Sequence, residues 1–474
     1  MSLRDRILSD INIYAAIHAL PNTLKEKSLI CGDQQQYLKD LREIYRYGAS
    51  HDKFITRCKD KLRKALDDEL NEPFKVSIFL KFKDGENGCT QYRPIHNCDI
   101  ETHVCLLAML QVLCFEDDYE KGTRGLSGLS TLIPKNYWGN RISTNGNEIY
   151  KPWAPAYTSF IQETINKAKK YKNNRQYNNE INLDFQDFFP SINLGWLSNT
   201  IKNKLSNKYT SEEDTETLNR ILELLMYFEI ESAETYNDRE LSIYYGQPTT
   251  FDESTTYYTK GLPQGLPHTY FFANIAMAEI EPYIRNEFDG DADFYVDDAV
   301  IFCNCDKNAF KASIDRLNFL FDISDINTFN YSEYQDINEF QKSHFAVGVK
   351  LHRDQKSSII DLTEDSSFTS DNLAMLYRNA SGISIEIRTS LSDLNDQITL
   401  NETQTICNAI KKELGRLDKI KDEADEDTLE SIRLYEKRIK SYYKYYTFRE
   451  LLILKKKNNT SESVLLKFYN LCDE

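Results

Sequence analysis

The sequence predicts an α/β fold of the α+β kind, and three features of the chain point to it. Two apolar runs flank the adjacent pair Asp297 and Asp298, which is the pattern of two short strands joined by a tight turn. A further apolar run ends at Asp184 and indicates a strand that carries a carboxylate at its end. A Gly/Pro-rich loop at 260–267 then leads into a helical pattern over 269–288. Strands and a long helix within one region favour a mixed fold.

The Asp297-Asp298 pair lies where the apolar run 294–296 meets the apolar run 299–302. Neighbouring side chains of a regular strand point to opposite faces, so two adjacent aspartates share one site only at a bend. Paired carboxylates on a rigid turn suit divalent metal ions, which prefer oxygen ligands and bind beside substrate phosphates. The tetrapeptide alone is equally compatible with a solvated turn, so its meaning depends on the rest of the chain.

Four segments with polar or glycine-rich signatures follow one another along the chain. They are Asp184 with Phe188-Phe189, then Leu262-Pro263-Gln264-Gly265, then Tyr295-Val296-Asp297-Asp298, and finally Gly348 to Leu351 continuing to Lys356. In this order and at these spacings the segments resemble the palm of a reverse transcriptase. The resemblance covers about residues 75–365 and implies a right-hand polymerase with fingers and palm. It also implies dNTPs as substrates, DNA as the product, and RNA as template or associated molecule.

The resemblance assigns roles to the acidic residues. Asp184 and Asp297 would be the principal ligands of two Mg²⁺ ions, for which Mn²⁺ could substitute, and Asp298 would be a weaker carboxylate. Phe185 would belong to the same metal site. The two ions would stabilise the entering and departing oxygens as a primer hydroxyl attacks the α-phosphate. Lys356 matches the lysine that protonates the departing pyrophosphate, although an ordinary solvated lysine is the alternative for that position.

The resemblance also implies contacts with nucleotide and template. Phe189 stands five residues after Asp184, where the family has its steric gate, and a ring there leaves no room for a 2′-hydroxyl. A core pair of Phe188 and Phe189 is the alternative. The implied nucleotide contacts are Asp187, Phe188, Phe189, Gln264, Lys81, Lys83 and Arg93. The implied contacts with the template are Arg141, Pro263 and Gly265. The basic residues on the hairpin around 84–88 could equally be solvated.

We expect four domains along the chain. They are an N-terminal helical extension at 1–72, fingers at 73–180, a palm at 181–365 and a helical thumb-like domain at 366–474. The fingers contain an expected hairpin between strands at 74–82 and 90–95 and a helix at 101–116. Past residue 366, helical patterns at 402–422, 427–446 and 448–457 stand in place of a conventional thumb signature.

This C-terminal architecture resembles bacterial abortive-infection and defence-associated reverse transcriptases. That narrower resemblance implies an antiphage role, assembly as a homo-oligomer and, in several members, priming from a protein hydroxyl. Tyrosine phenols are plausible nucleophiles for such priming. The candidates are Tyr442, Tyr443 and Tyr469, although helical packing explains most tyrosines of this kind.

Composition limits these expectations. The net charge of −16 disfavours broad electrostatic binding of nucleic acid, so such binding should be weak, salt-dependent or local. Ten cysteines without CxxC pairs or zinc spacing predict reduced thiols in the cytoplasm, and no apolar run is long enough to span a membrane. Three alternatives stay open: a non-catalytic nucleic-acid-binding scaffold, a conventional RNA-templated enzyme of a retroelement, and an RNA polymerase with the same palm.

Overall fold

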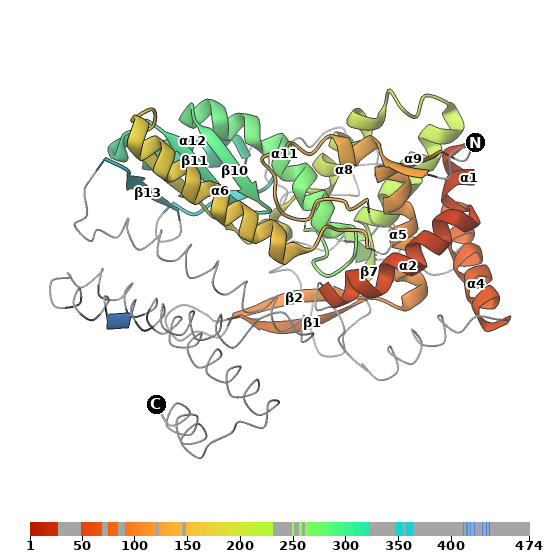
Figure 1. Cartoon of the computed structure of the whole chain (residues 1–474). Helices are drawn as coiled ribbons and strands as arrows, with labels where there is room; N and C mark the ends of the chain where they lie inside the picture. Colours follow the sequence, from red (N-terminus) through yellow and green to blue (C-terminus); the bar gives the residue numbers. More distant parts are fainter. Residues whose placement is uncertain are drawn as a thin grey trace, which may run out of the picture. The chain divides into compact units, whose positions relative to one another are not determined.

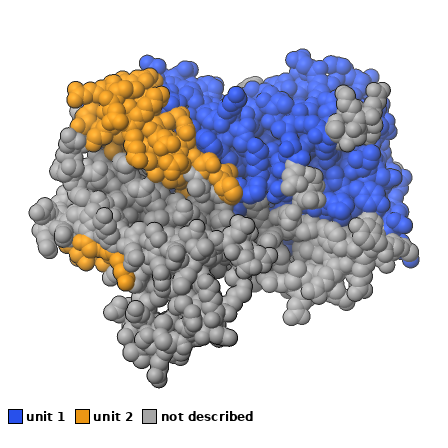
Figure 2. All heavy atoms as spheres, in the orientation of Figure 1, with its two compact units in different colours: residues 1–153, 183–299, 306–357 blue, residues 154–182, 300–305, 358–474 orange. Residues whose placement is uncertain are grey.

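The structure is a computed structural model of the 474-residue chain. It describes residues 1–26, 49–68, 74–83, 91–118, 123–144, 148–230, 249–250, 256–257, 261–321, 347–353, 357–363 and scattered positions from 411 to 436. The chain forms two compact units, coloured blue and orange in Figure 2. Unit 1 comprises residues 1–153, 183–299 and 306–357, and unit 2 comprises residues 154–182, 300–305 and 358–474.

Unit 1 contains a helix that is enclosed on all sides. In α5 (Ile100–Cys114) every residue except Glu101 is buried, as expected for a helix that is apolar all round. Asp99 caps its first turn by accepting a hydrogen bond from the backbone N–H of Thr102 at 2.9 Å. The helices packed against α5 are α1 (Leu3–Ile7), α2 (Asp10–Glu26), α4 (Ala49–Leu66) and α9 (Glu212–Met226), which Figure 1 shows around it. The predicted helix at 101–116 is present, but it ends at Cys114, and Phe115 and Glu116 begin strand β3 (Phe115–Asp118).

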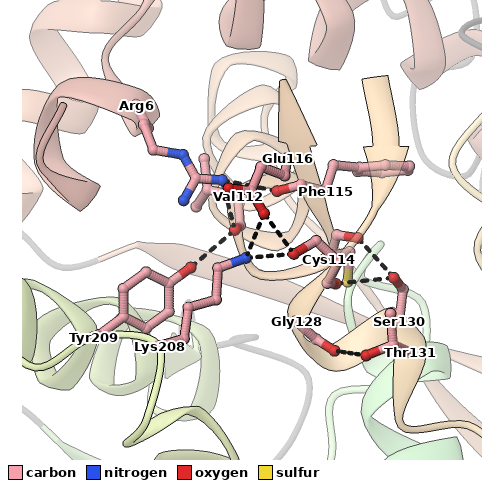
Figure 3. Close-up of polar contacts among 11 residues, drawn as sticks. Arg6, Val112, Cys114, Phe115, Glu116, Gly128, Ser130, Thr131, Lys208 and Tyr209 are labelled. Atoms are coloured by element: carbon pink, nitrogen blue, oxygen red, sulfur yellow. Dashed lines mark hydrogen bonds and ion pairs between the residues drawn. The ribbon is translucent and has the colours of Figure 1, made fainter. Parts of the chain in front are cut away.

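Side chains from distant parts of the chain cap the C-terminal end of α5 (Figure 3). The last carbonyls of a helix lack intrahelical partners and need donors from elsewhere. Donors to those carbonyls are Arg6 to Phe115 at 2.7 Å, Tyr209 to Val112 at 3.2 Å and Ser130 to Cys114 at 2.7 Å. Beside them, Lys208 Nζ donates to Ser127 Oγ at 2.6 Å and lies 3.7 Å from Glu116 Oε2. Because Arg6 belongs to α1, the N-terminal helix is tied to the same core.

The predicted hairpin of the fingers is present. Strand β1 (Lys75–Lys83) pairs antiparallel with β2 (Gln91–Asn97), with Ser77 opposite Asn97 at one end of the ladder. The short strand β7 (Glu229–Ile230) runs parallel to β1 and completes a three-stranded sheet in the order β2-β1-β7. Two short pairs of strands lie outside this sheet. Strand β3 (Phe115–Asp118) pairs with β4 (Thr123–Leu126), and β8 (Thr249–Thr250) pairs with β9 (Thr256–Tyr257). The short 3-10 helix η2 (Gly128–Thr131) follows β4 in the chain.

The predicted Asp-Asp hairpin is also present, and it belongs to a four-stranded sheet. Its strands, in spatial order, are β10 (Asp291–Tyr295), β11 (Asp298–Cys303), β5 (Asn179–Leu183) and β13 (Ser358–Asp361). Next to the end of β5, the short strand β6 (Phe185–Gln186) pairs antiparallel with β12 (Lys350–Leu351). The helices of this part of unit 1 are α7 (Phe188–Ser191), α8 (Leu194–Leu205), α11 (Thr269–Phe288) and α12 (Lys307–Phe321). The bounds of α11 coincide with the predicted helix at 269–288.

In unit 2, β13 pairs with β5 so that Ile359 stands opposite Ile181. The ring of Tyr171, from α6 (Trp153–Asn174), packs on Phe302 with centroids 5.2 Å apart. The described positions between 411 and 436 are helical and fall within the predicted helices 402–422 and 427–446. Lys421 forms an ion pair with Glu436 at 2.5 Å. The rest of the expected C-terminal domain lies outside the described residues, and within the described part no helix is long and apolar enough to cross a membrane.

Candidate active site

The hairpin β10–β11 places two aspartates at its tip. Strand β10 ends at Tyr295, Val296 and Asp297 form the turn, and Asp298 is the first residue of β11. Tight hairpins of two residues favour positive φ at the turn, since that matches the twist of the strands. Val296 has φ +58°, which is rare for a β-branched side chain. The turn therefore holds a strained backbone directly beside Asp297.

Asp184 lies immediately after β5 and is held through its own backbone. Its N–H donates to Ser357 Oγ at 3.3 Å, and its carbonyl accepts from the N–H of His352 at 2.9 Å. The β6–β12 ladder, in which Leu351 stands opposite Phe185, continues this anchoring. The imidazole Nε2 of His352 lies 3.8 Å from Asp184 Oδ2. No pattern in the sequence marks His352, which lies within the fourth segment between Leu351 and Lys356.

Asp184 follows β5 and Asp298 begins β11, and these two strands are neighbours in the four-stranded sheet. Asp298 is exposed as a whole residue, but protein atoms surround its carboxyl group. This desolvation raises the pKa of Asp298 well above its usual range, and the charges of Asp297 and Asp184 raise it further.

The donor set fits divalent cations of the Mg²⁺ type. Carboxylate oxygens are the ligands that Mg²⁺ prefers, and a bound cation would relieve the repulsion that raises the pKa of Asp298. Among the described residues the structure shows no group of three or more His, Cys, Asp or Glu side chains arranged to hold a metal ion. Mg²⁺ is usually bound by one or two carboxylates, and waters and substrate phosphates complete its coordination.

The three aromatic residues after Asp184 are all buried, and the rings of Phe188 and Phe189 lie with their centroids 6.1 Å apart. Phe185 and Phe188 are buried and pack against each other with centroids 5.2 Å apart, so Phe188 is a core residue. Phe189 contacts the ring of Tyr270 from α11 at 5.8 Å, and its carbonyl accepts from the N–H of Leu262 at 2.8 Å. Phe189 thus stands where the Gly/Pro loop meets α11. Asp187, two residues before Phe189, is exposed and adopts φ +39°.

His96 from β2 holds the Gln264 loop. Both its backbone N–H and its ring Nδ1 lie within hydrogen-bond distance of the Gln264 carbonyl, at 2.8 and 3.0 Å. Burial lowers the pKa of His96 to about 4, so the ring is neutral at pH 7 and its Nδ1–H is the donor. Gly265 has φ +122°, and a Cβ there would collide with main-chain atoms of His96. The carbonyl of Pro263, the residue before Gln264, accepts from Thr269 Oγ1 at 2.9 Å.

Arg141 is bonded to the main chain around it. Its Nη1 donates to the carbonyls of Pro134 and Tyr137 at 2.6 and 2.7 Å, and desolvation lowers its pKa. The guanidinium therefore stabilises the segment that precedes it. Contact with a template stays a prediction for this residue, as it does for Pro263 and Gly265.

Several predicted site residues cannot be placed. Lys356 and the candidate priming residues Tyr442, Tyr443 and Tyr469 lie outside the described residues. The backbones of the basic residues on the fingers hairpin are described, with Lys81 opposite Arg93 and Lys83 opposite Gln91 in the ladder. The positions of those side chains lie outside the description as well.

Comparison with known proteins agrees with this geometry. A search of curated proteins gives no match for the chain. Residues 139–321 match the family described as "Reverse transcriptase (RNA-dependent DNA polymerase)". The matched range contains Asp184, the Gln264 loop and the Asp297-Asp298 turn, while the fingers hairpin and the segment around His352 lie outside it. The chain therefore contains a reverse transcriptase domain at residues 139–321, and this domain implies RNA-directed DNA polymerase activity.

Proposed function

We propose that the protein synthesises DNA from dNTPs by nucleotidyl transfer assisted by two metal ions, with Asp184, Asp297 and Asp298 as the metal-binding carboxylates. The observation that carries this proposal is the position of Asp184 and the Asp297-Asp298 turn on neighbouring strands of one sheet, within the matched range 139–321. Two Mg²⁺ ions bound there would stabilise the charge on the attacking and leaving oxygens. Phe185, which follows Asp184, would complete the site through its backbone.

The task of the protein itself is to orient these carboxylates. Asp184 is fixed by hydrogen bonds from both of its backbone groups, to Ser357 and His352. The two aspartates of the hairpin are fixed by the turn geometry. Groups that are already oriented need little reorganisation when charge develops during the reaction, which is how most electrostatic catalysis operates. Lys356 would donate the proton to pyrophosphate.

We also propose that Phe189 excludes ribonucleotides. Tyr270 supports its ring, and the backbone of Leu262 holds its carbonyl. A supported ring beside the sugar would clash with a 2′-hydroxyl. Asp187, Phe188, Gln264, Lys81, Lys83 and Arg93 complete the proposed nucleotide site, and Arg141, Pro263 and Gly265 the proposed contact with the template.

Within the reverse transcriptases we place the chain with the defence-associated enzymes. Helical character at the described positions from 411 to 436 supports a helical C-terminal domain. The proposal includes four domains, with boundaries after residues 72, 180 and 365. It also includes an antiphage role in the cytoplasm and assembly as a homo-oligomer. DNA synthesis would be primed from the hydroxyl of Tyr442, Tyr443 or Tyr469.

Incorporation of labelled dNTPs in the presence of Mg²⁺ tests the proposal. Purified protein is assayed once with a primed RNA template and once with neither primer nor template, and products are separated on a denaturing gel. Asp297→Asn should abolish both kinds of product. Asp289→Asn is the matched control, because Asp289 is exposed and ends α11 in a left-handed conformation that asparagine also adopts.

The outcomes separate the parts of the proposal. Primer extension that disappears in Asp297→Asn supports the catalytic assignment. Label attached to the protein band, and lost in the same variant, supports priming from a protein hydroxyl. Label that is released as free DNA and never attached to protein contradicts the priming proposal. Equal incorporation by the wild-type protein and Asp297→Asn contradicts the catalytic site.

A further inference from the structure

Residues 136–138 run along the outer edge of β10. The N–H of Phe294 donates to the carbonyl of Asn136, and the N–H of Trp138 donates to the carbonyl of Phe294, both at 2.9 Å. Tyr137 forms a parallel bridge with Phe294. β10 is the edge strand of its sheet, so this segment acts as its outer partner. The strand it supports is the one that leads into the aspartate turn.

Side chains reinforce the same contact. The rings of Tyr137 and Phe294 are stacked, with centroids 4.9 Å apart and an interplanar angle of 14°. Trp138 Nε1 donates to Asp293 Oδ1 at 3.1 Å. The hydroxyl of Tyr137 donates to the carbonyl of Met277 in α11 at 3.0 Å. The segment is therefore fixed both to β10 and to the helix beside it.

Gly139 ends this segment and lies against the aspartate turn. A Cβ at Gly139 would lie 2.8 Å from Val296 Cγ2 and 3.3 Å from ring atoms of Tyr295. Real Cβ atoms do not approach other carbon atoms as closely as 2.8 Å, so Val296 or the Gly139 backbone would have to shift. The carbonyl of Gly139 accepts a buried hydrogen bond from Asn274 Nδ2 at 2.6 Å. This hydrogen bond holds the backbone of Gly139 beside the turn.

Val296 needs such support because its conformation is unfavourable by itself. Its φ of +58° is rare for a β-branched residue, and strained residues persist only where the surrounding structure holds them. The Val296 methyl group stands against Gly139, and the next residue is Asp297. Displacement of Val296 would therefore change the direction of the Asp297 carboxylate.

We propose that Gly139 is a positioning residue for the metal site. Its backbone, anchored by Asn274, leaves the space that Val296 occupies in its left-handed conformation and thereby orients Asp297 and Asp298 toward a divalent cation. The inference rests on the proposed function of these aspartates. It assigns the segment before Arg141 to support of the catalytic turn.

Binding of Mn²⁺, measured by electron paramagnetic resonance of the free ion, tests the proposal without relying on activity. Gly139→Ala should weaken Mn²⁺ binding roughly 10- to 100-fold, as is common when a residue that orients metal ligands is changed. It should lower kcat for dNTP incorporation and leave KM for the dNTP nearly unchanged. Val296→Gly should bind Mn²⁺ normally, since glycine adopts positive φ at no steric cost. The double variant should recover the affinity that Gly139→Ala loses.

Gly125→Ala is the matched control, because a Cβ at Gly125 meets no atom within 4 Å. Normal Mn²⁺ affinity in Gly139→Ala would overturn the proposal, and so would a loss that Val296→Gly does not restore. If Gly139→Ala does not fold, Asn274→Ser releases the Gly139 carbonyl without adding an atom, and unchanged affinity there overturns the proposal. Mn²⁺ binding that is equal in the wild-type protein and Asp297→Asn would instead contradict the metal site itself.

Discussion

Burial of His96 makes the free energy of unfolding depend on pH. The folded ring takes up a proton only near its lowered pKa of about 4, whereas a histidine in an unfolded chain does so near pH 6.5. The unfolded state therefore binds more protons below pH 6.5. The contribution of His96 to stability is complete above that pH and is lost as the pH falls toward 4.

The size of this effect follows from the two pKa values. At pH 5 the unfolded ring is almost fully protonated and the folded ring almost fully neutral, which corresponds to a loss of about 2 kcal/mol relative to pH 7. Burial also lowers the pKa of His103 to about 4 and that of His268 to about 3. The whole protein should therefore lose more stability than His96 alone accounts for.

His96→Asn isolates the contribution of this one ring. The Asn side-chain amide can replace Nδ1–H as donor to the Gln264 carbonyl, while it removes the titrating group. Urea unfolding followed by circular dichroism at pH 7 and pH 5 should show a pH-dependent loss that is smaller by about 2 kcal/mol in the variant. An identical loss in both proteins would refute the reasoning, because the buried ring would then not titrate as its surroundings require.

Three further changes have defined outcomes. Phe189→Ala should let the enzyme incorporate ribonucleotides, measured as the ratio of kcat/KM for dNTP and rNTP; an unchanged ratio would contradict the gate. Gly265→Ala should strongly reduce primer extension because the added Cβ collides with the backbone of His96, and normal extension would show that the loop can shift freely. Tyr209→Phe should lower the urea midpoint by the equivalent of about 1 kcal/mol, since α5 loses a capping hydrogen bond. The exposed Tyr283 supplies the control, and an equal effect of Tyr283→Phe would argue against capping.

The sequence pattern of single segments predicted the hairpin that carries the aspartates and the helix α11. Apolar runs on both sides of the Asp297-Asp298 pair predicted the two strands of the hairpin, and the helical pattern predicted the first and last residues of α11. The supports of the site were not predictable in this way. His96 and Gln264 are separated by 168 positions in the chain, and Gly139 fits Val296 only in the folded state. Nothing in the residues near either partner indicates such a contact.

The Arg141 segment shows how one pattern can serve two roles. The family resemblance implies a contact of Arg141 with the template, and in the structure Arg141 also bonds backbone carbonyls of its own segment. An arginine motif does not distinguish phosphate oxygens from peptide oxygens, because both accept the same donors. Only the fold determines which of these acceptors lies within reach.

Several contacts within unit 1 join residues that are far apart in the chain, and this affects how the protein can fold during its synthesis. The first helix bonds to residues far ahead of it, since Arg6 caps α5 at Phe115 and the N–H of Leu3 donates to Asp214 at 2.6 Å. The N–H of Asp184 likewise donates to the hydroxyl of Ser357, which lies much later in the chain. We therefore expect the backbone of Asp184, in the proposed metal site, to lack one of its two hydrogen bonds until residue 357 has left the ribosome. Ribosome-bound fragments that end before Asp214 should leave the N-terminal helix more sensitive to protease than the full chain does, because its partner residues are missing.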